Sequence, residues 1–332
     1  MIQRISTRLV TGLQRSFVRM GRDAVYRLGY LPSALRGAKG SRILVFHGLC
    51  AADRFRYNTL FITPKMFEAQ LKMYKKYFEV VSLEQFYRQD FRPGKFTMCL
   101  TFDDGFANNY KYVLPLLEAY KIPATFFVTS IRAAGYDILW NDLLSIAQKH
   151  GPARFSLGDE VFIKDTGGRY ISKRTRQALK EILRSTGFEA KAHLVEILAH
   201  CRHDADEDYW LQMNEEQIRA LASGKWATVG SHGYYHNDLA QLDPSSLRYE
   251  LAASKSWLEN ITNKEVKSLA FPYGSCSPAV ISEAKAAGYA ALLATESVPF
   301  ETAEPCLKQR LTINPFISPL NQLYANVAGN YE

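Results

Sequence analysis

The sequence predicts an α/β fold in which parallel strands alternate with helices. Short apolar runs rich in β-branched and aromatic residues, such as 42–46, 95–102 and 123–128, are typical of buried strands. Amphipathic helical stretches separate these runs, and strand–helix alternation indicates a parallel sheet. The chain has 332 residues, of which 47% are hydrophobic. That is enough for one large barrel domain or two smaller ones.

Each predicted element has a local signal in the sequence. Thr63-Pro64 caps a helix whose apolar positions Phe67, Leu71, Tyr74 and Phe78 keep helical spacing. Asp243-Pro244 starts a helix in the same way. The other expected helices are 83–89, 107–120 and 278–288, and the other expected strands are 78–82, 226–231, 268–271, 290–294 and 310–313.

The alternation stops between about residues 136 and 223, where we expect a mostly helical insertion. A small hairpin is expected at 155–163, followed by charged helices at 173–184 and 189–203. Loops at the catalytic face of a barrel determine substrate choice, so the insertion is a candidate for that role. Trp140 opens it, and its indole either stacks on a sugar or belongs to the core. The domain boundaries are then 1–40 for an N-terminal helix and linker and 41–332 for the barrel.

Two neighbouring carboxylates follow the central strand, at Asp103 and Asp104. Like charges at this spacing repel, and burial raises the pKa of both groups. Such a pair persists when a cation holds one carboxylate and the other has separate work. His232 and His236 follow a second strand, and a spacing of four lets both imidazoles converge on one ion. Three protein ligands leave positions for water and substrate, as in catalytic zinc sites.

The motifs Thr101-Phe-Asp-Asp-Gly105, His232-x-x-x-His236 and Phe271-Pro-Tyr-Gly274 resemble, in this order, the first three motifs of the polysaccharide deacetylases. These carbohydrate esterases are related to the nodulation chitooligosaccharide deacetylase, and the resemblance covers about 41–313. It implies a distorted (β/α) barrel of that type. It further implies that Asp103 is the general base, that Asp104, His232 and His236 bind the metal, and that the Tyr273 backbone amide belongs to an oxyanion hole.

Two positions depart from the family pattern. The third motif commonly opens with an arginine that braces the base, but Phe271 stands there. Arg310 either restores that cation or forms a surface salt bridge. The family's late histidine, a general acid, has no counterpart because no histidine follows His236. His47 ends the first strand, where a lone histidine is usually a core or turn residue. It stands on the rim where the other strands end, and some members of this family look circularly permuted, with the acid histidine at the first strand. We therefore predict that His47 is the proton donor. We assign substrate contacts to four residues: Phe271, Pro272, Trp140 and Arg310.

The function expected from these residues is metal-dependent hydrolysis of an N-acetyl group from an amino sugar in a glycan or lipid-linked saccharide. Mixed nitrogen and oxygen ligands favour Zn²⁺, with Co²⁺, Ni²⁺ or Mn²⁺ also tolerated. An amidase acting on a small non-sugar amide and an inactive glycan-binding relative stay open as alternatives. Two histidines and one carboxylate also describe non-haem iron oxygenases, although those usually place His and Asp two residues apart.

The net charge of +8 comes from the N-terminus, where residues 1–42 hold nine Lys or Arg and one acid. The remainder has 32 basic and 32 acidic residues, so nucleic acid is not an expected partner, and no protein partner is implied. Residues 2–20 form a basic amphipathic helix, with Phe17 and Met20 on its apolar side. It either packs on the barrel, lies on an anionic membrane through residues 1–30, or is an organelle presequence.

The five cysteines are scattered, without a Cys-x-x-Cys pair, which favours reduced thiols in a cytosolic chain. We therefore expect a cytoplasmic protein, peripheral on the inner membrane face if the N-terminal helix binds lipid. A deacetylase at that surface suggests a lipid-linked intermediate of envelope glycan synthesis.

Overall fold

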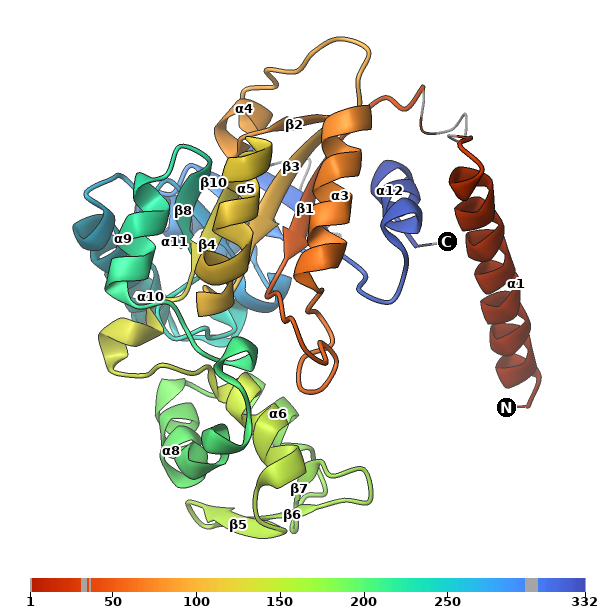
Figure 1. The fold of residues 1–332 in the computed structure, drawn as a ribbon. Coiled ribbons are helices and arrows are strands. Elements are labelled where there is room, and N and C mark those ends of the chain that lie inside the picture. Colours follow the sequence, from red (N-terminus) through yellow and green to blue (C-terminus); the bar gives the residue numbers. More distant parts are fainter. Residues whose placement is uncertain (1, 31–34, 36, 296–303, 332) are drawn as a thin grey trace.

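The computed structural model describes residues 2–30, 35, 37–295 and 304–331, with side chains from residue 15 onward. Its centre is a closed parallel barrel, which confirms the predicted fold class (Figure 1). The barrel order is β1-β11-β10-β9-β8-β4-β3, closed by pairing of β3 with β1. The short strand β2 (Glu79–Val81) adds to the start of β3. The barrel strands are β1 (Ser41–Phe46), β3 (Thr97–Phe102), β4 (Ala124–Val128), β8 (Ala227–Ser231), β9 (Ser268–Ala270), β10 (Ala291–Ala294) and β11 (Leu307–Thr312).

Helices surround the barrel, and several begin at a side-chain cap. The Thr63 hydroxyl accepts a hydrogen bond from the Met66 amide, and Asp243 caps its helix through the amides of Ser245 and Ser246. A π-helical turn at Asn109–Val113 leads into the next helix. The helices of this layer are α3 (Pro64–Tyr77), α4 (Leu83–Tyr87), α5 (Leu114–Tyr120), α10 (Pro244–Thr262), α11 (Pro278–Ala286) and α12 (Pro319–Ala328).

Strand alternation separates an outer apolar layer from the barrel interior. Phe46, Phe102 and Phe126 are in register on neighbouring strands, and their rings stack with centroids 5.0 Å apart beneath α3. The interior holds a smaller apolar cluster that includes Phe127 on β4. Successive strand residues point to opposite sides, so Asp103, directly after Phe102, turns toward the interior. Core packing thus determines the direction in which the carboxylate points.

The insertion between β4 and β8 has an apolar cluster of its own, below the barrel in Figure 1. The expected hairpin is present and gains a third strand, β7. The expected helix at 173–184 is wrong over its first half. Residues 170–172 form β7, and Arg176 turns with a φ of 63°, so the helix begins only at Leu179. The insertion's elements are α6 (Trp140–His150), β5 (Arg154–Leu157), β6 (Glu160–Lys164), β7 (Tyr170–Ser172), α7 (Leu179–Arg184), α8 (Phe188–Leu198), two 3-10 turns at 199–204 and 207–209, and α9 (Glu215–Ser223).

Helix α1 (Ile2–Arg27) lies beside α12 near the C-terminus (Figure 1). Two arginines of this helix, Arg19 and Arg22, contact the body of the protein. The Arg19 guanidinium donates to the Tyr331 carbonyl over 3.0 Å, and Arg22 lies 4.1 Å above the Tyr324 ring. Phe17 and Met20, on the predicted apolar side, face outward and are 71% and 66% exposed. The expected linker reaches residues 31–34 and 36, which lie outside the described residues. Among the described residues, no helix is long and apolar enough to cross a bilayer.

Candidate active site

The site residues lie on one rim of the barrel because parallel strands end there together. His47 follows β1, the two aspartates follow β3, His232 follows β8, and the turn at 272–274 follows β9. They line one cavity of about 450 Å³. The sequence analysis singled out eight residues of this cavity: His47, Asp103, Asp104, His232, His236, Phe271, Tyr273 and Gly274.

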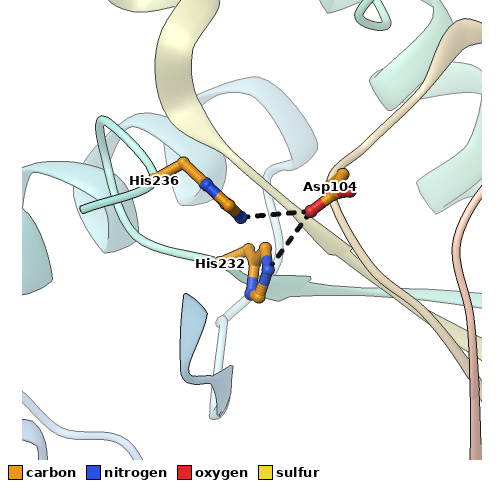
Figure 2. Close-up of side chains that lie close together, drawn as sticks. All are labelled: Asp104, His232 and His236. Atoms are coloured by element: carbon orange, nitrogen blue, oxygen red, sulfur yellow. Dashed lines mark ion pairs between the residues drawn. The ribbon is translucent and has the colours of Figure 1, made fainter. Parts of the chain in front are cut away.

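Asp104, His232 and His236 converge on one point (Figure 2). Asp104 Oδ1 lies 3.4 Å from His232 Nε2 and 3.2 Å from His236 Nε2. Ligand atoms placed tetrahedrally about 2.1 Å from one ion lie about 3.4 Å apart, so the separations fit a metal of zinc's size. All three residues are buried, with at most 6% exposure. The donor set and its spacing therefore suit a divalent cation.

Hydrogen bonds and charges orient this group. His232 Nδ1 lies 2.8 Å from the Ala270 carbonyl oxygen, and an N–H donated there leaves Nε2 free to face Asp104. Burial by itself would lower the pKa of His232, but the two neighbouring carboxylates raise it above its usual value. Burial lowers the pKa of His236, which keeps its imidazole neutral. Burial likewise opposes ionisation of Asp104, yet both histidines lower the pKa of that carboxyl well below its usual range.

The backbone is strained at three of these positions. Asp104, His236 and Tyr273 have φ angles of 73°, 56° and 60°. The left-handed region costs a residue other than glycine about 1–3 kcal/mol, and such residues cluster at functional sites. Gly105 follows with a φ of 83°, and a Cβ there would lie 2.9 Å from Val128 Cγ1. The tight turn after β3 therefore requires glycine at this position.

Asp103 pairs with Arg310 through the barrel interior. Arg310 Nη1 and Nη2 each donate to one carboxylate oxygen of Asp103 over 2.6 Å, and Nη1 also donates to Thr101 Oγ1 over 3.1 Å. Burial opposes ionisation, but the guanidinium outweighs it and lowers the pKa of Asp103. Asp103 is therefore an ionised carboxylate at neutral pH. Arg310 occupies the bracing position that the resemblance expects of an arginine in the third motif.

The assigned substrate contacts need two corrections. Neither Arg310 nor Pro272 is among the described residues that line the cavity. Arg310 lies behind Asp103, and Pro272 is buried in the turn after β9. Phe271 lines the cavity but is fully buried in the core. Trp140 is only 3% exposed, and the Lys191 ammonium lies 5.6 Å from its ring centroid. It packs in the core of the insertion and also lines the cavity, so its stacking on a sugar stays a prediction.

A buried polar network behind His236 is absent from the sequence motifs. Lys191 of α8 donates to Asn237 Oδ1 over 2.5 Å, and Asn237 donates to Glu250 Oε1 over 2.6 Å. Glu250 also accepts from the amides of Tyr234 and Tyr235. Charged residues on a helix usually face solvent, so no sequence signal identifies Lys191 as buried. The network ties the insertion to the loop that carries His236.

Asp142 is a cavity residue that the motifs miss. It is 4% exposed, and burial, followed by the charge of Asp104, raises the pKa of its carboxyl well above the usual range. The sequence signal that could have identified Asp142 is its position two residues after Trp140, at the start of the insertion.

The family model described as polysaccharide deacetylase matches residues 91–157 and 165–292. The Bacillus subtilis protein named "Putative polysaccharide deacetylase YxkH" is 20% identical over 258 residues, which are 76% of this chain and 64% of that protein. The chain thus spans less than two thirds of that relative's length.

Solved structures resemble the fold. The deacetylase PplD of Streptococcus pyogenes, in complex with acetate, has a TM-score of 0.57 at 18% identity. The matched part is 87% of this chain and 99% of the PplD chain. The polysaccharide deacetylase BC0361 of Bacillus cereus has a TM-score of 0.54 at 18% identity, over 87% of this chain and 69% of its own. These likenesses agree with the closed parallel barrel.

Proposed function

The chain belongs to the polysaccharide deacetylase family, and we propose that it hydrolyses an N-acetyl group from an amino sugar with the help of a divalent metal ion. One observation carries the proposal. A metal-ligand group and a separate, arginine-braced carboxylate lie in the same cavity. A site that only bound a metal ion, or only held a base, would not need two buried carboxylates.

Asp104, His232 and His236 would hold the ion. A divalent cation there supplies Lewis-acid polarisation of the acetyl carbonyl and a lowered pKa for the attacking water. Zn²⁺ suits one carboxylate and two imidazoles, and Co²⁺, Ni²⁺ or Mn²⁺ are alternatives of the same kind.

The chain's own residues carry the proton transfers. Asp103 takes a proton from the water that attacks the acetyl carbon, and the Tyr273 backbone amide donates to the developing oxyanion. His47 then donates a proton to the nitrogen as the C–N bond breaks. The products are acetate and a free amino sugar, and Arg310 keeps Asp103 ionised without contacting the substrate.

The test is acetate release from a panel of N-acetylhexosamine substrates by metal-stripped protein with and without added zinc or cobalt, beside Asp103→Asn. Release should depend on metal and fall in the variant by about 10²–10⁴-fold, the usual contribution of a positioned acid or base. Release only from small acetamides without a sugar would replace the proposal with an amidase. No release from any substrate by metal-loaded protein would favour a binding protein.

We also propose that the protein acts from the cytoplasm at the surface of an anionic membrane. The outward position of Phe17 and Met20 on α1 supports this, because Arg19 and Arg22 on the other side of the helix contact the C-terminal region. An amphipathic helix inserts its apolar side at the headgroup boundary, and nearby basic residues favour anionic lipid. A lipid-linked saccharide would then be the substrate within reach.

A further inference from the structure

The insertion supplies one wall of the cavity that holds the proposed metal ligands. Side chains at the start of α6 and on α7 line this wall, among them Asn141, Asp142, Ser145 and Lys180. The proposed catalytic chemistry uses none of them. This wall is therefore free to contact the part of a substrate that does not react.

Two side-chain oxygens on this wall are unsatisfied. Asp142 Oδ2 and Asn141 Oδ1 are buried, and neither has a hydrogen-bond partner among the described residues. A buried polar group left without a partner costs about 1–3 kcal/mol. Native proteins contain few such groups, and a ligand that completes the bonds is one physical reason for their presence.

Asp142 stands apart from the metal-ligand group. The side chains whose ligand atoms lie within 4.8 Å of one another are Asp104, His232 and His236. The groups close enough to lower the pKa of Asp142 are the Lys180 ammonium and the Asn58 side chain, after burial and Asp104 have raised it. Its neighbours thus provide hydrogen-bond donors and an acceptor beside the carboxyl.

We propose that Asp142, together with Asn141 and Lys180, binds hydroxyl groups of the sugar that carries the acetyl group. The inference rests on the proposed function and specifies which part of the cavity recognises the saccharide. A hydroxyl both donates and accepts, so it can bond to the two free oxygens and to the ammonium. Asp142 accepts from a hydroxyl in either protonation state. An apolar amide would leave the buried carboxyl unpaired, which disfavours such a ligand.

Binding can be measured without turnover in the zinc-loaded Asp103→Asn protein, by calorimetry with an N-acetylglucosamine tetramer. Adding Asp142→Leu should weaken binding at least tenfold, which is about 1.4 kcal/mol. Adding Asp142→Asn keeps a hydrogen-bonding side chain of the same size and should retain more affinity. The matched control is Asp159→Asn, at an exposed turn of the insertion, which should bind like the parent.

Zinc content and melting temperature separate this role from a structural one. Neither should fall in the Asp142 variants, because the carboxyl is neither a proposed ligand nor fully paired. Unchanged saccharide affinity in Asp142→Leu would overturn the inference, and so would an equal loss in Leu and Asn variants together with a lower melting temperature. Failure of the parent to bind saccharide, with no acetate release by the wild type, would instead overturn the proposed function.

Discussion

Arg310 controls the charge of Asp103 although the two residues are 207 positions apart in the chain. Burial alone would favour the neutral acid, and the bidentate guanidinium reverses that preference. The position of Arg310 on β11 also explains why Phe271 can occupy the start of the third motif. A cation from a later strand reaches the same carboxylate through the barrel interior.

Replacing Arg310 by Leu should shift the acid limb of the pH profile. The wild-type activity needs ionised Asp103. It is therefore present at pH values above the lowered pKa of Asp103 and is lost as the pH falls through that pKa. Without the guanidinium, burial raises the pKa of Asp103, so the acid limb of kcat/KM moves to higher pH. The free energy of unfolding should fall by about 3–5 kcal/mol, because a buried charge loses its partner.

The measurements are kcat/KM against pH for zinc-loaded protein and denaturant unfolding at neutral pH. Arg248→Leu is the control, because Arg248 forms an exposed pair with Glu283. Such a pair contributes about 0–1 kcal/mol. Coincident acid limbs for the wild type and Arg310→Leu would show that the ion pair does not set the protonation of the base.

At the scale of elements, α8 supports the His236 loop through Lys191. Burial lowers the pKa of this ammonium to about 8, although Glu250 and Asp238 oppose the shift. In the unfolded chain a lysine titrates near 10.4. Between these pH values the native state binds fewer protons than the unfolded state, so this group makes the free energy of unfolding rise with pH.

Lys191→Met should remove that dependence. The difference in unfolding free energy, wild type minus variant, is expected to increase between pH 7.5 and pH 10 by about 2–3 kcal/mol, since one pKa unit is worth about 1.4 kcal/mol. Denaturant unfolding at the two pH values gives this difference, with Lys173→Met at an exposed position as the control. A difference that stays constant with pH would mean that Lys191 is not buried as a shifted ammonium.

The sequence predicts the position of a site residue where its motif directly follows a recognisable strand. Asp103, Asp104 and His232 follow apolar strand runs, so both their order and their shared rim could be predicted. Pairings across the barrel, such as Arg310 with Asp103, depend on which strand lies opposite, and no local pattern encodes that. The wrong prediction of a helix over the first half of 173–184 has a similar cause. Charged residues there suit a helix, but pairing of 170–172 with β6 and the turn at Arg176 take precedence.

At the scale of the whole molecule, α1 extends beside the barrel (Figure 1). Its side chains Phe17 and Met20 face outward. The packed-helix alternative expects the opposite arrangement, with arginines in solvent and apolar side chains on the barrel. Arg19 and Arg22 instead contact the C-terminal region. The apolar surface at Phe17 and Met20 is thereby available to a lipid surface.

The double variant Phe17→Glu, Met20→Glu should reduce binding to anionic vesicles. Burying each apolar side chain contributes about 1.5–3 kcal/mol, so the loss should be at least about tenfold in affinity. Sedimentation with phosphatidylcholine vesicles containing phosphatidylglycerol measures binding, and vesicles of phosphatidylcholine alone test the contribution of charge. Phe316→Glu, at an exposed position on the body, is the control. Equal sedimentation of wild type and double variant would contradict a membrane role for this surface.

The central claim is that one cavity joins a metal-ligand group, a braced base and a proton donor from the first strand, His47. The most direct test measures zinc content and acetate release on the same preparation of His47→Ala, with the exposed His193→Ala as control. We predict unchanged zinc content and turnover reduced by about 10²–10⁴-fold in His47→Ala alone, the range for a general acid. Turnover equal to the wild type would contradict the assignment of His47. No residue would then be assigned as the proton donor to the departing amine.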